Sequence, residues 1–380
     1  MNILVFNWQD RSNPFAGGAE THLHEIFSRI VSAGHHVTLF CSMFKGAQHE
    51  EVLDGIHVIR EGSRNTFNFC VPRRYRRDFC YRNFDVVVDD INKIPFYTPL
   101  YVREPILALV HHFFGTSIFA EAGCVAGGYV YAAEALLPYV YRRIRFVAVS
   151  QSTKDELVCK GIPSEHIDVV PNCINPAQFP FAIQQNPAAT LTPIITYFGR
   201  LKRYKSVHHL LQAFALIADE FPHSKLRIVG KGDAEAELRR LANRLGLTTD
   251  RYAGRIEFMG LIPEEQKVTV LSEAYCVVHP SMKEGWGIVN IEANACGVPV
   301  IAADVPGLRD AVRHEYSGLL YEYGNIHALA DTIRRILKDR QLYSQLQRGA
   351  LAFARQFTWD ISAHRILQIL EECCAYNFSQ

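Results

Sequence analysis

The chain carries almost no net charge and lacks the cysteine spacings typical of a metal site or a disulfide-stabilised fold. Over its 380 residues the formal net charge is +1, which gives no general reason to expect nucleic acid as a partner. Apart from the neighbours Cys373 and Cys374, the ten cysteines stand singly, without a C-x-x-C pair or zinc-like spacing. We therefore expect no metal site and a reducing, cytoplasmic compartment.

The sequence also has little that suggests a secretory leader or a membrane span. Met1 and Asn2 run directly into an apolar segment, without the charged region and cleavage site of a signal peptide, so we expect no secretory signal. The apolar stretch 122–140 contains Glu134 and Pro138. These residues favour a core or surface helix over a membrane span.

A dinucleotide fingerprint is missing as well. The glycine-containing segment 14–20 follows the first apolar run but has no G-x-G-x-x-G pattern. A nicotinamide site would also need an acid after the next strand, where Cys41 and Ser42 stand instead. Redox chemistry with a bound cofactor is therefore disfavoured.

What the first half does contain is an alternation of short apolar runs with helical patterns. Such alternation is typical of a parallel α/β sheet. Between the first two runs, apolar residues recur at helical spacing until Gly34, which predicts a strand–helix–strand unit. The runs expected to form strands are 3–6, 36–41, 56–59, 86–88, 106–110 and 146–149.

Segment 171–193 is rich in Asn, Pro, Gln and Ala, without sustained periodicity, and we interpret it as an interdomain linker. The alternation then restarts, so a second doubly wound domain is predicted. Its expected strands are 194–198, 226–229, 256–259, 275–279 and 298–302. We predict a first domain at residues 1–175, a second at 176–359, and a final helix at about 360–380 that packs back on the first.

The most informative segment runs from His279 to Glu292, where a strand is followed by a glycine-containing turn and a helix. Gly285 and Gly287 allow close approach of the backbone to an anion, and the amides that open the helix are free donors at its positive end. Glu284 on the turn and Glu292 on the helix could contact two parts of an extended ligand, such as a sugar and a ribose. The spacing alone is equally compatible with no ligand at all, in which case Glu284 is a solvated acid in a loop and Glu292 is an acid on the face of a helix.

Cationic and glycine-rich segments follow two other strands of the second domain. Arg200 and Lys205 lie just after run 194–198, with Ser206 as a candidate helix N-cap. Ligands of open parallel sheets bind at the carboxyl ends of the strands. Two cations in this position suit a diphosphate. Arginine and lysine after a strand are, however, commonly just solvated. Gly230 and Gly232, after run 226–229, permit close backbone approach or simply make a turn.

In the first domain, His111 and His112 end run 106–110. An imidazole at a strand end could donate a hydrogen bond to a sugar hydroxyl or move a proton. A purely structural histidine is equally compatible with the sequence, and the sequence does not decide which of the two is functional.

The densest local charge is a run of arginines interleaved with aromatic residues. The run spans residues 73–82 and follows Phe67, Phe69 and Val71. This pattern suits an anionic membrane surface or a lipid-phosphate acceptor, whereas charge runs in general are solvated faces. The residues that we assign to this hypothesis are Arg73, Arg74, Arg76 and Arg77, together with His112 as an acceptor contact.

Taken together, these segments resemble the large retaining glycosyltransferase family 4. The resemblance implies an α/β chain with the GT-B fold, in which two Rossmann-like, doubly wound domains face a central cleft. It covers most of the chain and depends on the order and spacing of several motifs. These motifs are Gly17–Glu20, Val147–Ser150, Val170–Ile174, Phe198–Leu201 with Lys205, Val229–Asp233, Phe258–Gly260 and the E-x7-E pair Glu284 and Glu292.

The resemblance also implies roles for individual residues. Arg200 and Lys205 would neutralise the donor diphosphate, Glu292 would hold the ribose hydroxyls, Glu284 would contact the donor sugar, and His111 would lie near the reacting carbon. The implied catalytic residues are His111, Glu284, Arg200 and Lys205. The implied donor-binding residues are Gly17, Gly18, Gly230, Gly260, Gly285, Gly287, Ile288 and Glu292.

Transfer with retention of configuration, without metal or cofactor, is the reaction that the resemblance implies. The donor is expected to be a nucleotide-sugar, with UDP or GDP as the nucleotide. The basic segment suggests an acceptor that is a lipid-linked glycan or glycolipid of the cell envelope, with the enzyme peripheral to the inner face of the membrane. The alternatives are a soluble small-molecule acceptor and a non-catalytic subunit that binds nucleotide-sugars.

Overall fold

The computed structural model describes residues 1–92, 94–115, 118–183 and 192–377. The chain divides into two units, one formed by Met1–Cys173 with Trp359–Gln380 and the other by Ile174–Thr358. The division falls within the segment interpreted as a linker, of which residues 184–191 lie outside the described part of the chain. The last residues of the expected final helix, 378–380, also lie outside it.

Within the described residues the first unit contains an eight-stranded sheet in the order β3-β4-β2-β1-β5-β6-β7-β8. The neighbouring strands pair in parallel, except for β3 and β4. The adjacent strands β5 and β6 are buried along their whole length, as a sheet covered on both faces requires. The strands are β1 (Asn2–Phe6), β2 (His36–Ser42), β3 (Glu50–Leu53), β4 (Ile56–Glu61), β5 (Val86–Ile91), β6 (Ile106–Val110), β7 (Arg145–Ala148) and β8 (Ile167–Val169).

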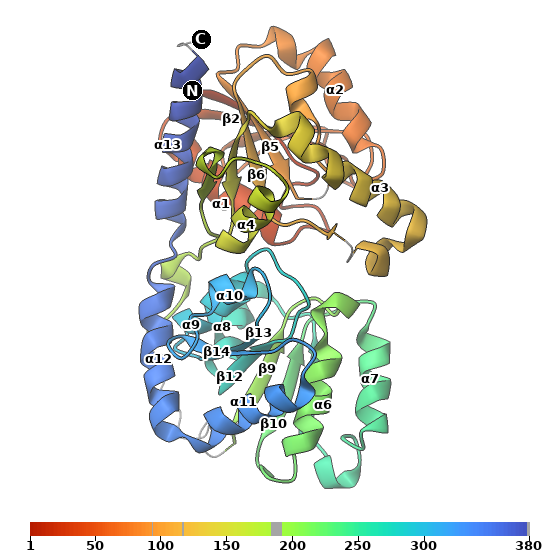
Figure 1. Cartoon of the computed structure of the whole chain (residues 1–380), viewed down its shortest axis with the longest axis vertical. Helices are drawn as coiled ribbons and strands as arrows, with labels where there is room; N and C mark the ends of the chain where they lie inside the picture. The colour runs from red at the N-terminus through yellow and green to blue at the C-terminus, as the bar shows by residue number, and fades with distance from the viewer. Residues whose placement is uncertain (93, 116–117, 184–191, 378–380) are drawn as a thin grey trace. The chain divides into compact units, whose positions relative to one another are not determined.

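Five α-helices belong to the described part of this unit. The last of them returns to the first unit and packs against the first helix, as Figure 1 shows. Its apolar residues Ile366, Ile369 and Leu370 are buried. The helices are α1 (Gly18–Ser32), α2 (Phe67–Arg77), α3 (Ile118–Tyr141), α4 (Gln151–Cys159) and α13 (Trp359–Asn377).

The described part of the second unit contains a six-stranded parallel sheet in the order β11-β10-β9-β12-β13-β14. The strands are β9 (Ile194–Phe198), β10 (Lys225–Val229), β11 (Ile256–Gly260), β12 (Cys276–His279), β13 (Val300–Ala303) and β14 (Gly318–Tyr321). The helices are α6 (Val207–Ile217), α7 (Glu235–Arg244), α8 (Glu264–Ser272), α9 (Ile288–Ala295), α10 (Leu308–Ala311), α11 (Ile326–Lys338) and α12 (Arg340–Ala354).

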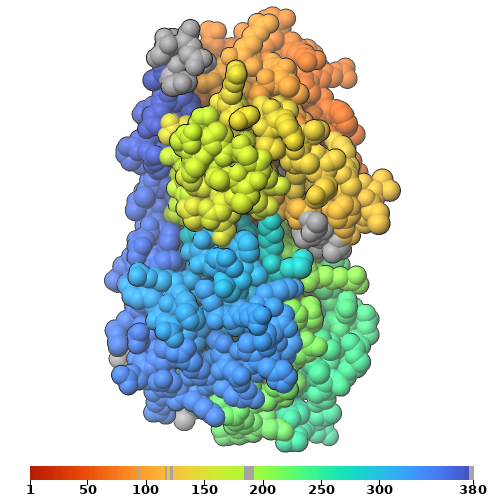
Figure 2. Space-filling view, viewed as in Figure 1, coloured from red at the N-terminus to blue at the C-terminus, as the bar shows by residue number. Residues whose placement is uncertain are grey.

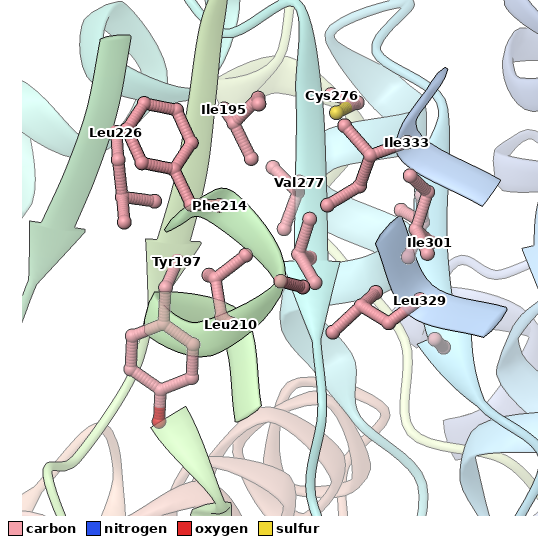
Figure 3. Packing of buried hydrophobic residues seen from close by; sticks show 14 of the residues in the cluster. Ile195, Tyr197, Leu210, Phe214, Leu226, Cys276, Val277, Ile301, Leu329 and Ile333 are labelled. Atoms are coloured by element: carbon pink, nitrogen blue, oxygen red, sulfur yellow. The ribbon is translucent and has the colours of Figure 1, made fainter. Parts of the chain in front are cut away.

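The core of the second unit shows why its sequence alternates between two periodicities. Leu210 and Phe214 of α6 lie one helical turn apart, as do Leu329 and Ile333 of α11, and all four side chains are fully buried. Figure 3 shows them over the side chains that the strands direct to the same face of the sheet. The two helices also pack against each other, so each apolar stripe is covered on two sides.

The α/β class and the sheets predicted from the sequence are confirmed, but three strands were missed. These are β3, β8 and β14, with four, three and four residues. The sequences of β3 (EEVL) and β8 (IDV) contain acidic residues and therefore lack a continuous apolar run. The antiparallel hairpin of β3 and β4 turns at Asp54 and Gly55, both with positive φ. An Asp-Gly pair between two extended segments is a hairpin signal that the sequence did offer.

Residues 122–140, expected to be a core or surface helix, belong to α3. Its backbone leaves the helical conformation at Gly123, which has φ of 71° and ψ of 177°. Several large apolar residues of α3 are exposed, among them Val125 and Tyr139, so much of the helix lies at the surface. In the described part of the chain no helix has both the length and the apolar character that crossing a membrane requires.

The packing of α12 gives a test of the second unit. A Cβ at Gly349 would lie 1.9 Å from the carbonyl oxygen of Tyr316, so Gly349→Ala should destabilise the chain by about 2–3 kcal/mol despite the better helix propensity of alanine. Gly128 of α3 is a matched control, because a Cβ there meets nothing within 4 Å. Gly128→Ala should leave stability unchanged or raise it by up to about 1 kcal/mol. The measurement is thermal unfolding followed by circular dichroism. Equal melting temperatures of the two variants would contradict this account.

Candidate active site

In the second unit, the residues predicted to bind the donor diphosphate and the donor sugar lie after the carboxyl ends of parallel strands. Arg200 and Lys205 follow β9, whereas Glu284 follows β12, and these two strands are neighbours in the sheet. The backbone amide of Met282 donates to the carbonyl of Tyr204 at 2.8 Å and so joins the two loops. The sheet topology therefore brings together groups that are about 80 residues apart in sequence.

Three glycines end the strands β9, β10 and β11 at the same edge of the sheet. The amide of Gly230 donates to the carbonyl of Gly260 at 2.8 Å, and the amide of Gly199 donates to that of Val229 at 3.0 Å. At Gly230, where φ is 129°, a Cβ would lie only 1.9 Å from the carbonyl oxygen of Gly199. Close contact between loop backbones accounts for glycine at Gly230, with or without a ligand.

The side chains of Lys205 and Glu284 form a buried ion pair. The Lys205 ammonium bonds Oε1 of Glu284, and the two side chains are only 12% and 13% exposed. His279, the last residue of β12, brings Nε2 to 3.2 Å from the same oxygen, and its Nδ1 lies 3.0 Å from Asn290 Oδ1. In contrast, Arg200 is exposed. Of the two predicted cations, one is therefore held in place and the other remains accessible.

Burial and charge act in opposite directions on this pair. Burial opposes ionisation of Glu284, but Lys205 and His279 outweigh it and hold the pKa of the carboxyl well below its ordinary value. Burial likewise opposes the charge of Lys205, but Glu284 outweighs that effect and raises the pKa of the ammonium. Both groups are therefore ionised at neutral pH.

Helix α9 begins at this loop and carries Glu292 in its second turn. The N-cap is Gly287 with φ of 88°, a left-handed conformation that favours glycine. Glu292 is buried, and its Oε1 lies 2.9 Å from the ammonium of Lys267 on α8.

Ser206 does occupy the position before α6, but its side chain does not cap the helix. Its left-handed backbone, with φ of 50°, is accompanied by a 3.0 Å contact between its hydroxyl and that of Tyr323.

Buried polar atoms without a hydrogen-bond partner gather in this segment. Among the described residues, those between positions 281 and 292 are Ser281 Oγ, Trp286 Nε1, Asn290 Nδ2 and Glu292 Oε2. Each such atom costs about 1–3 kcal/mol if it stays unpaired. A concentration of them beside a charged pair and a helix N-terminus is typical of a ligand site.

In the first unit, His111 is held from two sides. Its Nε2 lies 2.9 Å from Oδ1 of Asp90 on β5, and its ring meets the ring of His22 on α1 edge-on at 5.2 Å. His111 is buried, whereas His112 is half-buried and has its ring against Phe114. The Asp90 contact fixes the ring orientation of His111, which a hydrogen-bonding or proton-moving role would require.

The predicted glycine turn lies directly before α1. Gly17 is the N-cap, the helix begins at Gly18, and the Gly17 amide donates to Oε2 of Glu20 at 2.7 Å. The other oxygen of Glu20 accepts from Asn92, just after β5, at 3.0 Å. Glu20 therefore ties the turn to the strand that carries Asp90.

The arginine run divides into two groups. Arg74 and Arg77 contact Glu61, each at 3.1 Å, and Arg74 also pairs with Asp78. Among the described residues the structure records no ion pair for Arg73 or Arg76, which are exposed. Two of the four arginines assigned to the membrane hypothesis, Arg74 and Arg77, therefore already have acidic partners.

Three supporting residues were not predicted from the sequence to belong to the site, namely Asp90, His279 and Lys267. Asp90 did offer a signal, since Asp89 and Asp90 interrupt an otherwise apolar strand. Lys267 offered no sequence signal, because a lysine is common on a helix.

In the described residues, His, Cys, Asp and Glu form no group of three or more that could hold a metal ion.

Two models of one family match nearly the whole chain. The model described as Glycosyltransferase Family 4 matches residues 16–178, and the one described as Glycosyl transferases group 1 matches residues 178–352. The chain belongs to glycosyltransferase family 4.

Curated relatives carry names from this family. D-inositol 3-phosphate glycosyltransferase of Corynebacterium glutamicum is 32% identical over 190 residues, which are 48% of this chain and 44% of that protein. The chain thus matches about half the length of this relative. An uncharacterized glycosyltransferase of Methanocaldococcus jannaschii is 24% identical over 97% of each chain.

Solved structures of glycosyltransferases have the same fold. Sucrose-phosphate synthase from Thermosynechococcus elongatus aligns with a TM-score of 0.77 at 21% identity, over 99% of each chain. Anabaena HepE in complex with UDP-glucose aligns with a TM-score of 0.73 at 21% identity, over 98% of this chain and 100% of that one. The GT-B fold expected from the sequence is therefore confirmed.

The Lys205 and Glu284 pair can be tested by a double-mutant cycle. Lys205→Met or Glu284→Gln alone leaves a buried charge without its main partner, and each should cost about 3–5 kcal/mol at pH 7. The double variant should cost clearly less than the sum. Because the pKa of Glu284 is lowered on folding, the coupling should be present above the ordinary carboxyl pKa and lost as pH falls through the lowered value. Additive losses in denaturant unfolding would show that the two groups do not interact.

Proposed function

We propose that this protein is a retaining glycosyltransferase that moves a sugar from a nucleotide-sugar to an acceptor, without a metal. The observation that carries the proposal is the buried Lys205 and Glu284 pair beside the N-terminus of α9, in a segment with four unpartnered buried polar atoms. This combination offers both charges and unused hydrogen-bonding groups to an anionic, hydroxyl-rich ligand.

The donor diphosphate would be held by Arg200 and Lys205. An ammonium has three donors, so Lys205 can keep its bond to Glu284 and still donate to a phosphate oxygen. The exposed Arg200 can close on a phosphate in bidentate geometry. The amides of Gly287 and Ile288, at the positive end of α9, would add donors without adding a metal charge.

The remaining groups suit the two sugars of the donor. Glu292, with one oxygen unpartnered, would accept from ribose hydroxyls, and Glu284 would contact the transferred sugar. The complex of HepE with UDP-glucose supports UDP as the first nucleotide to test. His111, oriented by Asp90, would donate to a hydroxyl of the transferred sugar near the reacting carbon.

In the proposed reaction the bond from the anomeric carbon to the phosphate oxygen breaks and a bond to the acceptor oxygen forms on the same face. The acceptor proton passes to the leaving phosphate, whose charge Arg200 and Lys205 offset. Retention is read from the anomeric proton coupling of the product by NMR, and an inverted product would contradict this mechanism.

A melting screen with UDP, GDP, ADP, dTDP and NAD tests the donor site, because a ligand that binds the folded chain raises its melting temperature. We expect a selective shift with one nucleoside diphosphate. Lys205→Met should abolish most of this shift and lower turnover at least about 100-fold, whereas Glu284→Gln should lower turnover with less effect on nucleotide binding.

Lys202→Met is the matched control for Lys205→Met. Lys202 lies on the same loop, is more exposed, and pairs with Asp233 at 2.6 Å, so its loss should leave turnover within about threefold of wild type. A shift with NAD alone, or equal activity in the Lys202 and Lys205 variants, would overturn the donor site. A chain that binds the nucleotide but transfers no sugar to any acceptor would favour a non-catalytic subunit.

We further propose that the acceptor is lipid-linked and that α2 and α3 contact an anionic membrane. The two helices adjoin through Asn68 and the Tyr129 hydroxyl, at 2.8 Å, and they form part of the surface of the first unit in Figure 2, in orange and gold. Exposed apolar side chains and exposed arginines both occur on this surface, a combination that suits anionic lipid. The exposed residues are Phe69, Arg73 and Arg76 of α2, Val125, Leu136 and Tyr139 of α3, and Arg142 and Arg143 after it.

Vesicle sedimentation tests this surface. Arg73→Gln with Arg76→Gln should weaken binding to phosphatidylglycerol vesicles about tenfold or more at low salt, with little effect on neutral vesicles. Arg239→Gln with Arg240→Gln removes the same charge from α7 in the second unit and should change nothing. Equal binding of all three proteins would contradict the membrane surface. It would favour a soluble acceptor, which the name of the inositol-phosphate relative also suggests.

A further inference from the structure

Lys267 of α8 reaches from the neighbouring helix to Glu292 of α9. Its ammonium lies 2.9 Å from Oε1 of Glu292 and 2.5 Å from Oε1 of Glu264. The side chains of Lys267 and Glu292 are only 16% and 8% exposed, whereas that of Glu264 is 75% exposed. The close contact between Lys267 and Glu292 is thus mostly shielded from water.

The charge of Lys267 acts directly on the state of Glu292. Burial raises the pKa of the Glu292 carboxyl above its ordinary value, and Lys267 counteracts that rise. In the other direction, burial opposes the charge of Lys267, but Glu292 and Glu264 outweigh it and raise the pKa of the ammonium. Without Lys267, a carboxylate in this position would be driven towards its neutral form.

The two oxygens of Glu292 are not used alike. Oε1 accepts from Lys267, whereas Oε2 is buried and has no hydrogen-bond partner among the described residues. A carboxylate pinned at one oxygen cannot rotate freely about its last bond. Its second oxygen therefore keeps one direction, and the donor that would satisfy it must come from a ligand or a water molecule.

We infer that Lys267 is a positioning residue for the ribose of the donor. It keeps Glu292 ionised and turned so that Oε2 accepts from a ribose hydroxyl, and it does not itself contact the nucleotide. This inference rests on the proposed function, because it assumes that Glu292 faces the ribose. It adds a residue that sequence reasoning did not assign to the site.

Calorimetric titration of the full chain with UDP and with 2′,3′-dideoxy-UDP tests the inference. Wild type should bind UDP about tenfold or more tightly than the dideoxy compound, because hydrogen bonds to a charged acceptor are strong. In Lys267→Met this preference should fall below about threefold, mainly through weaker binding of UDP. Lys267→Arg should retain the preference, since an arginine can keep both the charge and the bond to Oε1.

Lys338→Met is the control for loss of a lysine from the second unit. Lys338 of α11 also pairs with a glutamate, Glu220, and the variant should show the wild-type preference. If Lys267→Met does not fold, Lys267→Gln takes its place, because glutamine keeps a donor but not the charge. Melting temperatures of all variants separate loss of folding from loss of discrimination.

The outcomes distinguish this inference from the function on which it depends. Equal weakening of both ligands in Lys267→Met, with the tenfold preference kept, would show that Lys267 only ties α8 to α9 and would overturn the inference alone. If wild type does not bind UDP, the same titration is made with GDP and 2′,3′-dideoxy-GDP. A wild-type chain that binds neither nucleotide overturns the UDP or GDP donor of the proposed function, and the inference falls with it.

Discussion

The site in the second unit depends on one buried interaction, the ion pair between Lys205 and Glu284. It joins the loops that follow two neighbouring parallel strands, and His279 supports the same carboxylate oxygen. Neither charge could be buried alone, since each would lose its hydration without compensation. The pair therefore allows two loops to pack closely while keeping charge available for a ligand at the edge of the sheet.

In both units, some of the unsatisfied polar atoms lie at or after the carboxyl ends of strands. Among the described residues of the second unit, four of them lie in the segment from Ser281 to Glu292, and in the first unit they include Asp90 Oδ2 and Asn92 Oδ1 at the end of β5. Parallel topology is the physical reason, since successive strands end at the same edge and their loops collect there. The unpaired atoms lower stability, and they leave each edge prepared for hydrogen bonds that only a ligand or water supplies.

The sequence was a good guide where a single segment contains the whole signal. Alternating periodicity located most strands, and the E-x7-E spacing placed Glu284 on the turn and Glu292 on the helix, as the structure has them. Contacts between segments could not be derived in this way. Nothing in the sequence indicated that Lys205 pairs with Glu284 or that Arg74 and Arg77 share Glu61, because such pairings depend on loop packing and sheet order and not on local pattern.

The residues that escaped prediction have a common physical role, which is to support another residue that faces the ligand. Asp90 fixes the ring of His111, and Lys267 compensates the charge of Glu292, each across the gap between adjacent elements of one unit. A residue that acts through another needs only the right charge at the right distance. Several residue types on several elements can therefore fill the supporting role, and no sequence motif marks them. A buried functional carboxylate or imidazole whose partner is absent from its own motif therefore predicts a supporting group on a neighbouring strand or helix.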